Sequence, residues 1–511
     1  MARSNFGGVA NPAKFVTESI CLYEANPVTC SAFSISLPTP RRFHSIPVFF
    51  LLLMAICGFA NADVPKAKPS GCALTDTEVA GLNGDASTDI HAISNYSKTM
   101  YALLKAGKSE QLDCLADSAR SRKETFPGGI WKIHAFYLDL VRPPLHPTEE
   151  DWAAHIDLVK RWVSERPESI TARIALAESY TNYGADARGT GFADTVSESG
   201  WRLLGERTAK AKQILDEAST LSTRDPEWYA AMQIIALGSW EPGVRRALFE
   251  QAVEFEPAYY YYYRSYAYSI LPKWGGEEGE TEKFLQTAAD RIGGDAGDIL
   301  YFRVAGTLVC GCQNDQELKL SWPRIQKGFD AVEKRNGPSV ANWNLFAHLA
   351  QSFDDAFVAD KMFTKIGDQW SDDYWRNSSD FDSAKQWAKQ MAPISAKRRA
   401  AEESAEANLH TPAGQRYKTT FDENIHTWMQ PCVEASAGSR LGHFELLIKV
   451  GKEGDIEDIN GTGVSPLMQC LGHKLHDFQQ SKQAVFPPPP QPDYWFRLDF
   501  NSESSTSAAL K

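Results

Sequence analysis

The sequence has few long apolar runs and no excess of basic residues, and each of these absences excludes a class of protein. Its 511 residues contain only one long apolar run, which excludes a protein that crosses the membrane many times. Lys and Arg number 53 against 65 Asp and Glu, and this formal charge of −12 argues against a general nucleic-acid binder, which needs a basic surface for phosphates. With 43% hydrophobic and 23% charged residues, the composition is that of a folded protein and excludes an intrinsically disordered one.

Motifs for catalysis are also missing. The sequence has no Gly-rich phosphate loop, no Gly-x-Ser-x-Gly elbow and no His-Glu-x-x-His. Acidic pairs such as Glu277–Glu278 and Asp354–Asp355 are typical of solvated helix faces in an acidic protein. We therefore expect no catalytic residues, no cofactor and no metal site.

The single apolar run predicts export. Residues Ile46–Phe59 are apolar, Arg41 and Arg42 precede them, and Ala60-Asn61-Ala62 follows. A basic patch, a short apolar core and a small-x-small end form a secretory signal peptide, with cleavage expected after Ala62. The run is too short to span a bilayer comfortably, so we expect a periplasmic or secreted protein with no stable transmembrane anchor after cleavage.

The cysteines agree with an oxidising compartment. The mature chain would keep an even number of them, and their clustering along the sequence suggests three local pairs: Cys72–Cys114, Cys310–Cys312 and Cys432–Cys470. Six cysteines allow fifteen pairings, so the connectivity stays open. Cys310-Gly311-Cys312 admits a redox-active or metal-binding reading, but structural cysteines are the preferred interpretation because no further ligand lies nearby in sequence.

Between Asp89 and Leu409 the sequence reads as a succession of amphipathic helices. In Glu150–Glu165, four apolar side chains share one helix face: Trp152, Ile156, Val159 and Trp162. Prolines at positions 167, 226, 257 and 338 mark helix starts, since proline in the first turn costs no hydrogen bond. The fold class expected is mainly α, with a small α+β domain after the helices.

The helical spacing is similar to that of tetratricopeptide (TPR) repeats, which stack helical hairpins. Small and aromatic residues approximate the repeat at Trp343, Phe346, Ala347, Ala350, Ala359, Phe363 and Ile366. Five motifs occur in order: Ala187–Phe192, Asp225–Tyr229, Phe249–Ala252, Glu256–Tyr259 and Leu271–Gly276. This series resembles a bacterial family of unknown function, helical and TPR-like, and would cover about residues 90–335. The resemblance implies a fold but supplies no catalytic residues.

The tail predicts a different domain. His443–Val450 and Ile456–Asn460 are expected to be strands joined by a Gly-containing turn, followed by a helix over Ser465–Phe478 and a last strand ending at Phe500. This order resembles the C-terminal domain of TonB-type energy transducers over roughly 415–502. The expected organisation is therefore 1–62 leader and signal peptide, 63–88 linker, 89–409 TPR-like helical domain, 410–502 TonB-C-like domain and 503–511 disordered tail.

The function expected is that of an exported bacterial scaffold, without catalysis, that binds an unidentified envelope protein or peptide through its helical surface. Seven tyrosines between Tyr259 and Tyr268 cover a whole helix circumference, so some should be exposed. The candidate contact residues are Tyr260, Tyr261, Tyr262 and Trp274. The alternative is a cell-envelope glycan- or peptidoglycan-acting enzyme or binder, which would need two buried acids facing each other. A thiol-redox role for Cys310 and Cys312 is a third hypothesis.

Overall fold

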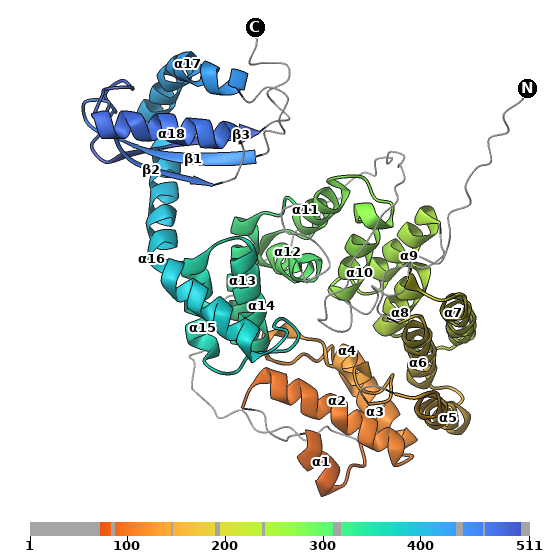
Figure 1. Cartoon of the computed structure of the whole chain (residues 1–511). Coiled ribbons are helices and arrows are strands. Elements are labelled where there is room, and N and C mark those ends of the chain that lie inside the picture. Colours follow the sequence, from red (N-terminus) through yellow and green to blue (C-terminus); the bar gives the residue numbers. More distant parts are fainter. Residues whose placement is uncertain are drawn as a thin grey trace, which may run out of the picture. The chain divides into compact units, whose positions relative to one another are not determined.

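The computed structural model describes residues 72–82, 87–144, 147–189, 195–237, 241–309, 318–435, 443–462 and 466–501. It is mainly helical, with a small three-stranded antiparallel sheet near the C-terminus (Figure 1). The expected fold class is confirmed at this level, whereas TPR repeats as such are not established. The predicted signal peptide and the Cys310–Cys312 pair lie outside the described residues.

The chain divides into two compact units. The first, the helical unit, comprises the chain up to Asp354 together with Lys361–Lys385. The second, the sheet unit, comprises Asp355–Asp360 and the chain from Gln386 onward. Helices α15 (Ala356–Ile366) and α16 (Ser378–Leu409) each contribute to both units. The division therefore falls earlier than the boundary at residue 410 expected from the sequence.

The helical unit is a succession of helices in which neighbours along the chain pack together, among them α5 with α6, α6 with α7, and α12 with α13. Its helices before α15 are α1 (Asp76–Leu82), α2 (Asp89–Lys105), α3 (Ser109–Ser121), α4 (Lys132–Tyr137), α5 (Glu149–Glu165), α6 (Ile170–Arg188), α7 (Glu198–Ala218), α8 (Pro226–Leu237), α9 (Pro242–Phe255), α10 (Tyr261–Ser269), α11 (Glu280–Ile292), α12 (Gly294–Val309), α13 (Trp322–Asn336) and α14 (Val340–Ser352). Short 3-10 turns occur at η3 (Pro127–Gly129) and η5 (Pro272–Trp274).

Local sequence explains where these helices begin. The face predicted for α5 is buried at all four of its apolar positions, and a capping box between Thr148 and Asp151 starts the helix. Pro226 is the first residue of α8, as predicted. The other three prolines lie just outside their helices, and Ser169 and Ser339 cap α6 and α14 with their hydroxyl groups.

Residues far apart in the sequence join the two ends of the helical unit. Asp89 of α2 is buried, and its carboxylate accepts hydrogen bonds from the Ser339 hydroxyl (2.5 Å) and the Val340 amide (2.7 Å). The N-terminus of α14 is therefore capped by a residue 250 positions away. Arg303 adds a second link, since it donates to the Gly128 carbonyl and to Asn342 Oδ1.

The sheet unit contains α17 (Pro412–Ala435), β1 (His443–Val450), β2 (Ile456–Thr462), α18 (Pro466–Ser481) and β3 (Tyr494–Asn501). Strand β1 is central and pairs antiparallel with both neighbours, so that Ile448 lies opposite Ile459 and Phe496. The three predicted strands and the helix between the last two are confirmed within a few residues, although Ser465, the expected helix cap, lies outside the described residues.

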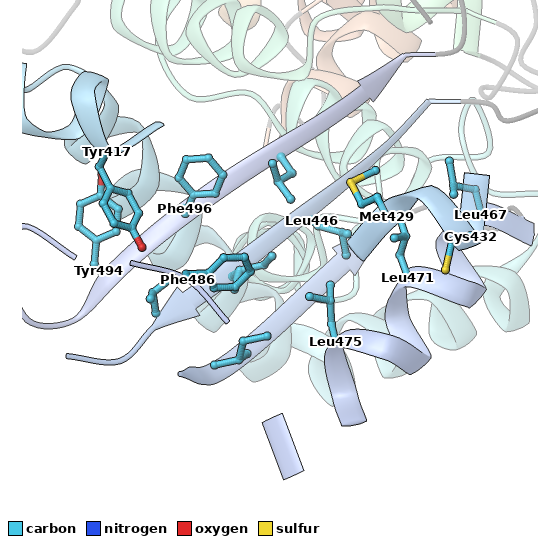
Figure 2. Close-up of a cluster of buried hydrophobic side chains, with 14 residues drawn as sticks. Tyr417, Met429, Cys432, Leu446, Leu467, Leu471, Leu475, Phe486, Tyr494 and Phe496 are labelled. Carbon is cyan, nitrogen blue, oxygen red and sulfur yellow. The ribbon is translucent and has the colours of Figure 1, made fainter. Parts of the chain in front are cut away.

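Alternate side chains of β1 belong to two hydrophobic clusters, one on each face of the sheet. Leu446 and Ile448 belong to a buried cluster with α17 and α18, in which Leu471 and Leu475 point toward the strands (Figure 2). Leu447 faces the other way and packs on Ala401 and Ala405 of α16. Because α16 covers this second face, its C-terminal part belongs with the sheet, which is why the division between units precedes residue 410.

Two of the three expected disulfides are confirmed. Cys72 bonds to Cys114 and thereby ties the segment before α1 to α3. Cys432 bonds to Cys470 and ties α17 to α18, within the sheet unit.

Candidate functional site

The expectation of exposed aromatic contact residues is wrong. Tyr260, Tyr261, Tyr262 and Trp274 are only 8%, 5%, 0% and 2% exposed. Helix α10 packs against α8, α9, α11 and α12, which bury most of its tyrosines, whereas Tyr266 is partly buried. The run of tyrosines was expected to leave some rings exposed to water, but neighbouring helices cover the candidate contact residues.

The buried tyrosines instead belong to an internal polar network. Tyr260 donates to the Tyr261 hydroxyl (2.8 Å), and the Tyr261 ring stacks on His134 of α4 with centroids 3.7 Å apart. Tyr259 donates to Glu227, a fully buried carboxylate of α8 that also pairs with His134. Burial and the charge of Glu227 raise the pKa of Tyr259 well above its ordinary value, so its hydroxyl stays a donor.

One opening among the described residues is a cavity of about 320 Å³ in the helical unit, which we call the acidic cavity. Helix α3, the turn between α5 and α6, and the segment before α8 surround it. Its lining residues are Asp113, Asp117, Glu165, Arg166, Pro167, Glu168, Ser169, Ile170, Thr171 and Thr223. Four of the lining side chains are carboxylates and one, Arg166, is a guanidinium group, so the lining residues carry a net negative charge.

Local structure places these carboxylates. Asp113 and Asp117 are one helical turn apart on α3, so they share a face. Asp113 accepts from Arg166 Nε (2.9 Å) and from the Ser169 hydroxyl (2.5 Å), which ties α3 to the start of α6. Burial raises the pKa of Asp113, and the charge of Asp117 adds to that effect, whereas the bonds from Ser169 and Arg166 oppose it.

The other two carboxylates come from the turn between the helices. Glu165 ends α5 and accepts from the Ser109 hydroxyl at 2.6 Å. Glu168 is exposed at the rim. Glu165 is also exposed and lies 3.9 Å from Arg161 of the same helix. The cavity therefore has a partly buried acidic wall, formed by Asp113, and a hydrated acidic rim.

A buried ion pair lies directly behind the cavity wall. Arg120 of α3 contacts Asp117 and Thr171, both lining residues, and on its other side binds the fully buried Asp225. Asp225 also accepts from the Glu227 amide at 2.8 Å. One chain of contacts therefore runs from the cavity to the interior of the helical unit.

Sequence reasoning missed the acidic cavity because its lining residues come from three separate segments. Two local signals were present in the sequence: acids at positions 113 and 117, spaced by one helical turn, and a Glu-Arg-Pro-Glu-Ser turn over 165–169. Neither signal says that the two segments meet. Only the packing of α3 against the start of α6 brings them together.

Among the described residues, no three His, Cys, Asp or Glu side chains gather in a way that could hold a metal ion. No helix within the same residues is long and apolar enough to cross a membrane.

Comparison with known proteins finds no match, either among protein-family models or among curated proteins. The function is therefore inferred from the geometry of the site.

Proposed function

We propose that the protein is an exported scaffold that binds a protein or peptide partner through its helical unit, with the acidic cavity receiving a Lys or Arg side chain. The observation that carries the proposal is the set of four carboxylates around a cavity of about 320 Å³. That volume lies at the small end of the range for ligand pockets, about 300–1,000 Å³, and suits one long side chain.

The charges of the cavity support a cationic ligand. Asp113 is nearly enclosed, so an ammonium or guanidinium group that reaches it leaves part of its water and interacts more strongly than at an open surface. Hydrogen bonds between charged groups contribute about 1.5–3 kcal/mol each. The exposed Glu165 and Glu168 would attract the ligand over a longer range, in a manner that salt screens.

Export and the two resemblances belong to the same proposal. The signal-like leader and the two disulfides both favour an oxidising compartment. Packed helical neighbours are what a TPR-like array would require, and a strand-strand-helix-strand order along the chain is what the TonB-C-like tail would require. We carry over no energy-transducing role from that resemblance.

Calorimetric titration of the mature chain with hexalysine, and with hexaglutamate as the opposite-charge probe, tests the proposal. Hexalysine should bind and hexaglutamate should not, and raised salt should weaken the binding. Replacing both rim acids (Glu165→Gln with Glu168→Gln) should weaken hexalysine binding about tenfold, because each exposed charge contributes only modestly.

The matched control replaces two exposed acids elsewhere in the helical unit, Glu277→Gln with Glu278→Gln, which changes the net charge equally. This variant should bind hexalysine as the unaltered chain does. If the two double variants weaken hexalysine binding equally, the peptide responds to the overall charge of the protein. The cavity would then not be the hexalysine-binding site.

The enzymatic alternative is favoured by one observation: Asp113 and Asp117 line the same cavity in different environments, since Asp113 is buried and Asp117 is exposed. Burial raises the pKa of Asp113. Glycan hydrolysis uses two carboxyl groups whose environments differ, one as the acid and one as its partner. If this alternative holds, the mature chain should release soluble fragments from isolated peptidoglycan, and Asp113→Asn should abolish the release. Absence of fragments with the unaltered chain would eliminate this candidate.

A further inference from the structure

The ion pair behind the acidic cavity poses an electrostatic problem. Arg120 brings a positive charge against the wall of a site that we propose receives a cation, and it touches Asp117 at 2.5 Å and the Thr171 hydroxyl at 2.7 Å. An uncompensated guanidinium at this position would repel the ligand and would neutralise one of the four carboxylates.

The buried carboxylate of Asp225 compensates the charge of Arg120. Its Oδ2 atom lies 2.6 Å from Arg120 Nη2 and 2.8 Å from Nε, and its side chain is fully buried. Tyr137 donates to the same oxygen (3.3 Å), and the Glu227 amide donates to the other (2.8 Å). Because Asp225 is held by α8 and α4 as well as by Arg120, it cannot rotate away without breaking several hydrogen bonds.

The two partners differ in their exposure and therefore in their roles. The Arg120 side chain is 11% exposed and reaches toward the cavity, whereas Asp225 has no exposed surface and cannot touch a ligand in the cavity. Burial disfavours the Arg120 cation, but Asp225, Tyr137 and Asp117 outweigh that cost and raise the pKa of Arg120. Arg120 therefore stays charged at any pH the protein meets.

We propose that Asp225 is a positioning residue for cation binding: it neutralises Arg120 and fixes the guanidinium that holds Asp117 and Thr171 at the cavity wall. This inference rests on the proposed function. It assigns specificity to a residue that no ligand contacts, since Asp225 balances the charge of Arg120 and the lining keeps its net negative charge. Without Asp225, the unbalanced charge of Arg120 would reduce that net negative charge by one.

The test is the titration of the mature chain carrying Asp225→Asn with hexalysine. Asparagine keeps one side-chain oxygen, which can still accept from Arg120. It places an NH2 group where the other oxygen accepts from the Glu227 amide, and it removes the compensating charge. Hexalysine affinity should fall about tenfold, and the loss should shrink at high salt, where the unbalanced charge is screened. A purely structural role would lower the melting temperature and leave the affinity of the folded fraction and its salt dependence unchanged, and this result would overturn the inference.

A second variant keeps the inference testable if Asp225→Asn does not fold. Thr171→Val is nearly isosteric, retains the Arg120–Asp225 pair and removes one of the anchors of the guanidinium at the wall. It should weaken hexalysine binding at least twofold, and unchanged affinity would contradict the positioning role.

The two proposals fail differently. If the unaltered chain does not bind hexalysine, the proposed function fails. If it binds, and the rim variant Glu165→Gln with Glu168→Gln weakens binding while Asp225→Asn and Thr171→Val do not, only the positioning role fails.

Discussion

The two units of this protein are stabilised in different ways. The sheet unit has a large apolar cluster in which side chains of β1, β3, α17 and α18 meet (Figure 2). A smaller apolar cluster joins β1 to α16, and a disulfide joins α17 to α18. The helical unit buries many charged groups, among them Asp89, Asp225, Glu227 and Arg303. Each of these is bonded to a residue far away in the sequence or on another helix.

This difference follows from how each unit satisfies its backbone. In a sheet, neighbouring strands satisfy most of each other's amides and carbonyls, so the interior can be apolar. Each helix of an array leaves unsatisfied amides at its N-terminus, and those that become buried need partners. Asp89 at the start of α14 is such a partner, and its use of a residue from α2 links distant parts of the helical unit.

Removing the sheet unit's disulfide should have the largest effect. Cys432→Ala with Cys470→Ala releases a constraint on 38 residues, which in the chain-entropy description destabilises the unit by about 4 kcal/mol. Hydrogen exchange of the β1 amides should accelerate, while exchange in α12 stays unchanged. The matched control is Cys72→Ala with Cys114→Ala, which should affect exchange near α1 and α3 but not in β1; slowed or unchanged exchange in β1 after loss of Cys432–Cys470 would contradict this prediction.

Acid should selectively weaken the helical unit. His155 is 2% exposed, and burial lowers its pKa to about 4. The unfolded chain takes up a proton below its ordinary pKa of about 6.5 while the folded chain does not, so stability is present above pH 6.5 and is lost as pH falls toward 4. Through His155 alone, the free energy of unfolding should fall by about 3 kcal/mol between pH 7 and pH 4.

The measurement for His155 is hydrogen exchange in α5 and α6 between pH 7 and 4, corrected for the intrinsic pH dependence of exchange. His155→Gln removes the titrating group and serves as the comparison variant, since glutamine can still bond to the Ser179 hydroxyl, which lies 3.2 Å from His155 Nε2. An equal loss of protection in the variant and the unaltered chain would show that His155 is not responsible.

Asp89→Ala should have the smallest of these effects. Loss of a helix N-terminal cap costs about 1–2 kcal/mol, and here the effect should appear both in α14, whose amides lose their acceptor, and in α2. Asp89→Asn keeps an acceptor oxygen and should cost less. If only α2 loses protection, the link between the two ends of the unit does not contribute to stability.

Several elements could be read directly from the sequence. The buried face of α5 follows from a spacing that only a helix turns to one side, and the strand His443–Val450 follows from a β-rich run before a Gly turn. The disulfides Cys72–Cys114 and Cys432–Cys470 were suggested by clustering along the chain. Each of these patterns is local.

The errors concern surroundings that local patterns do not describe. Some of the seven tyrosines between Tyr259 and Tyr268 were expected to be exposed, because they cannot all fit one helix face. The candidate contact residues Tyr260, Tyr261 and Tyr262 are instead buried, because four helices pack against α10. The C-terminal part of α16 was assigned to the helical domain from its composition, yet Ala401 and Ala405 pack on the sheet. A helix's sequence says which residues share a face but not what covers that face.

The amino-acid sequence by itself determined the helical and strand segments and the change of architecture near the C-terminus, because spacing and turn chemistry act over a few residues. It suggested two disulfide pairs, which the structure confirms. The tertiary structure alone decided which carboxylates line one cavity, which tyrosines are buried and which buried acid compensates the charge of Arg120. Those outcomes depend on segments separated by 50 to 250 positions, such as Ser169 with Asp113 and Ser339 with Asp89, whose approach is set by the packing of whole helices.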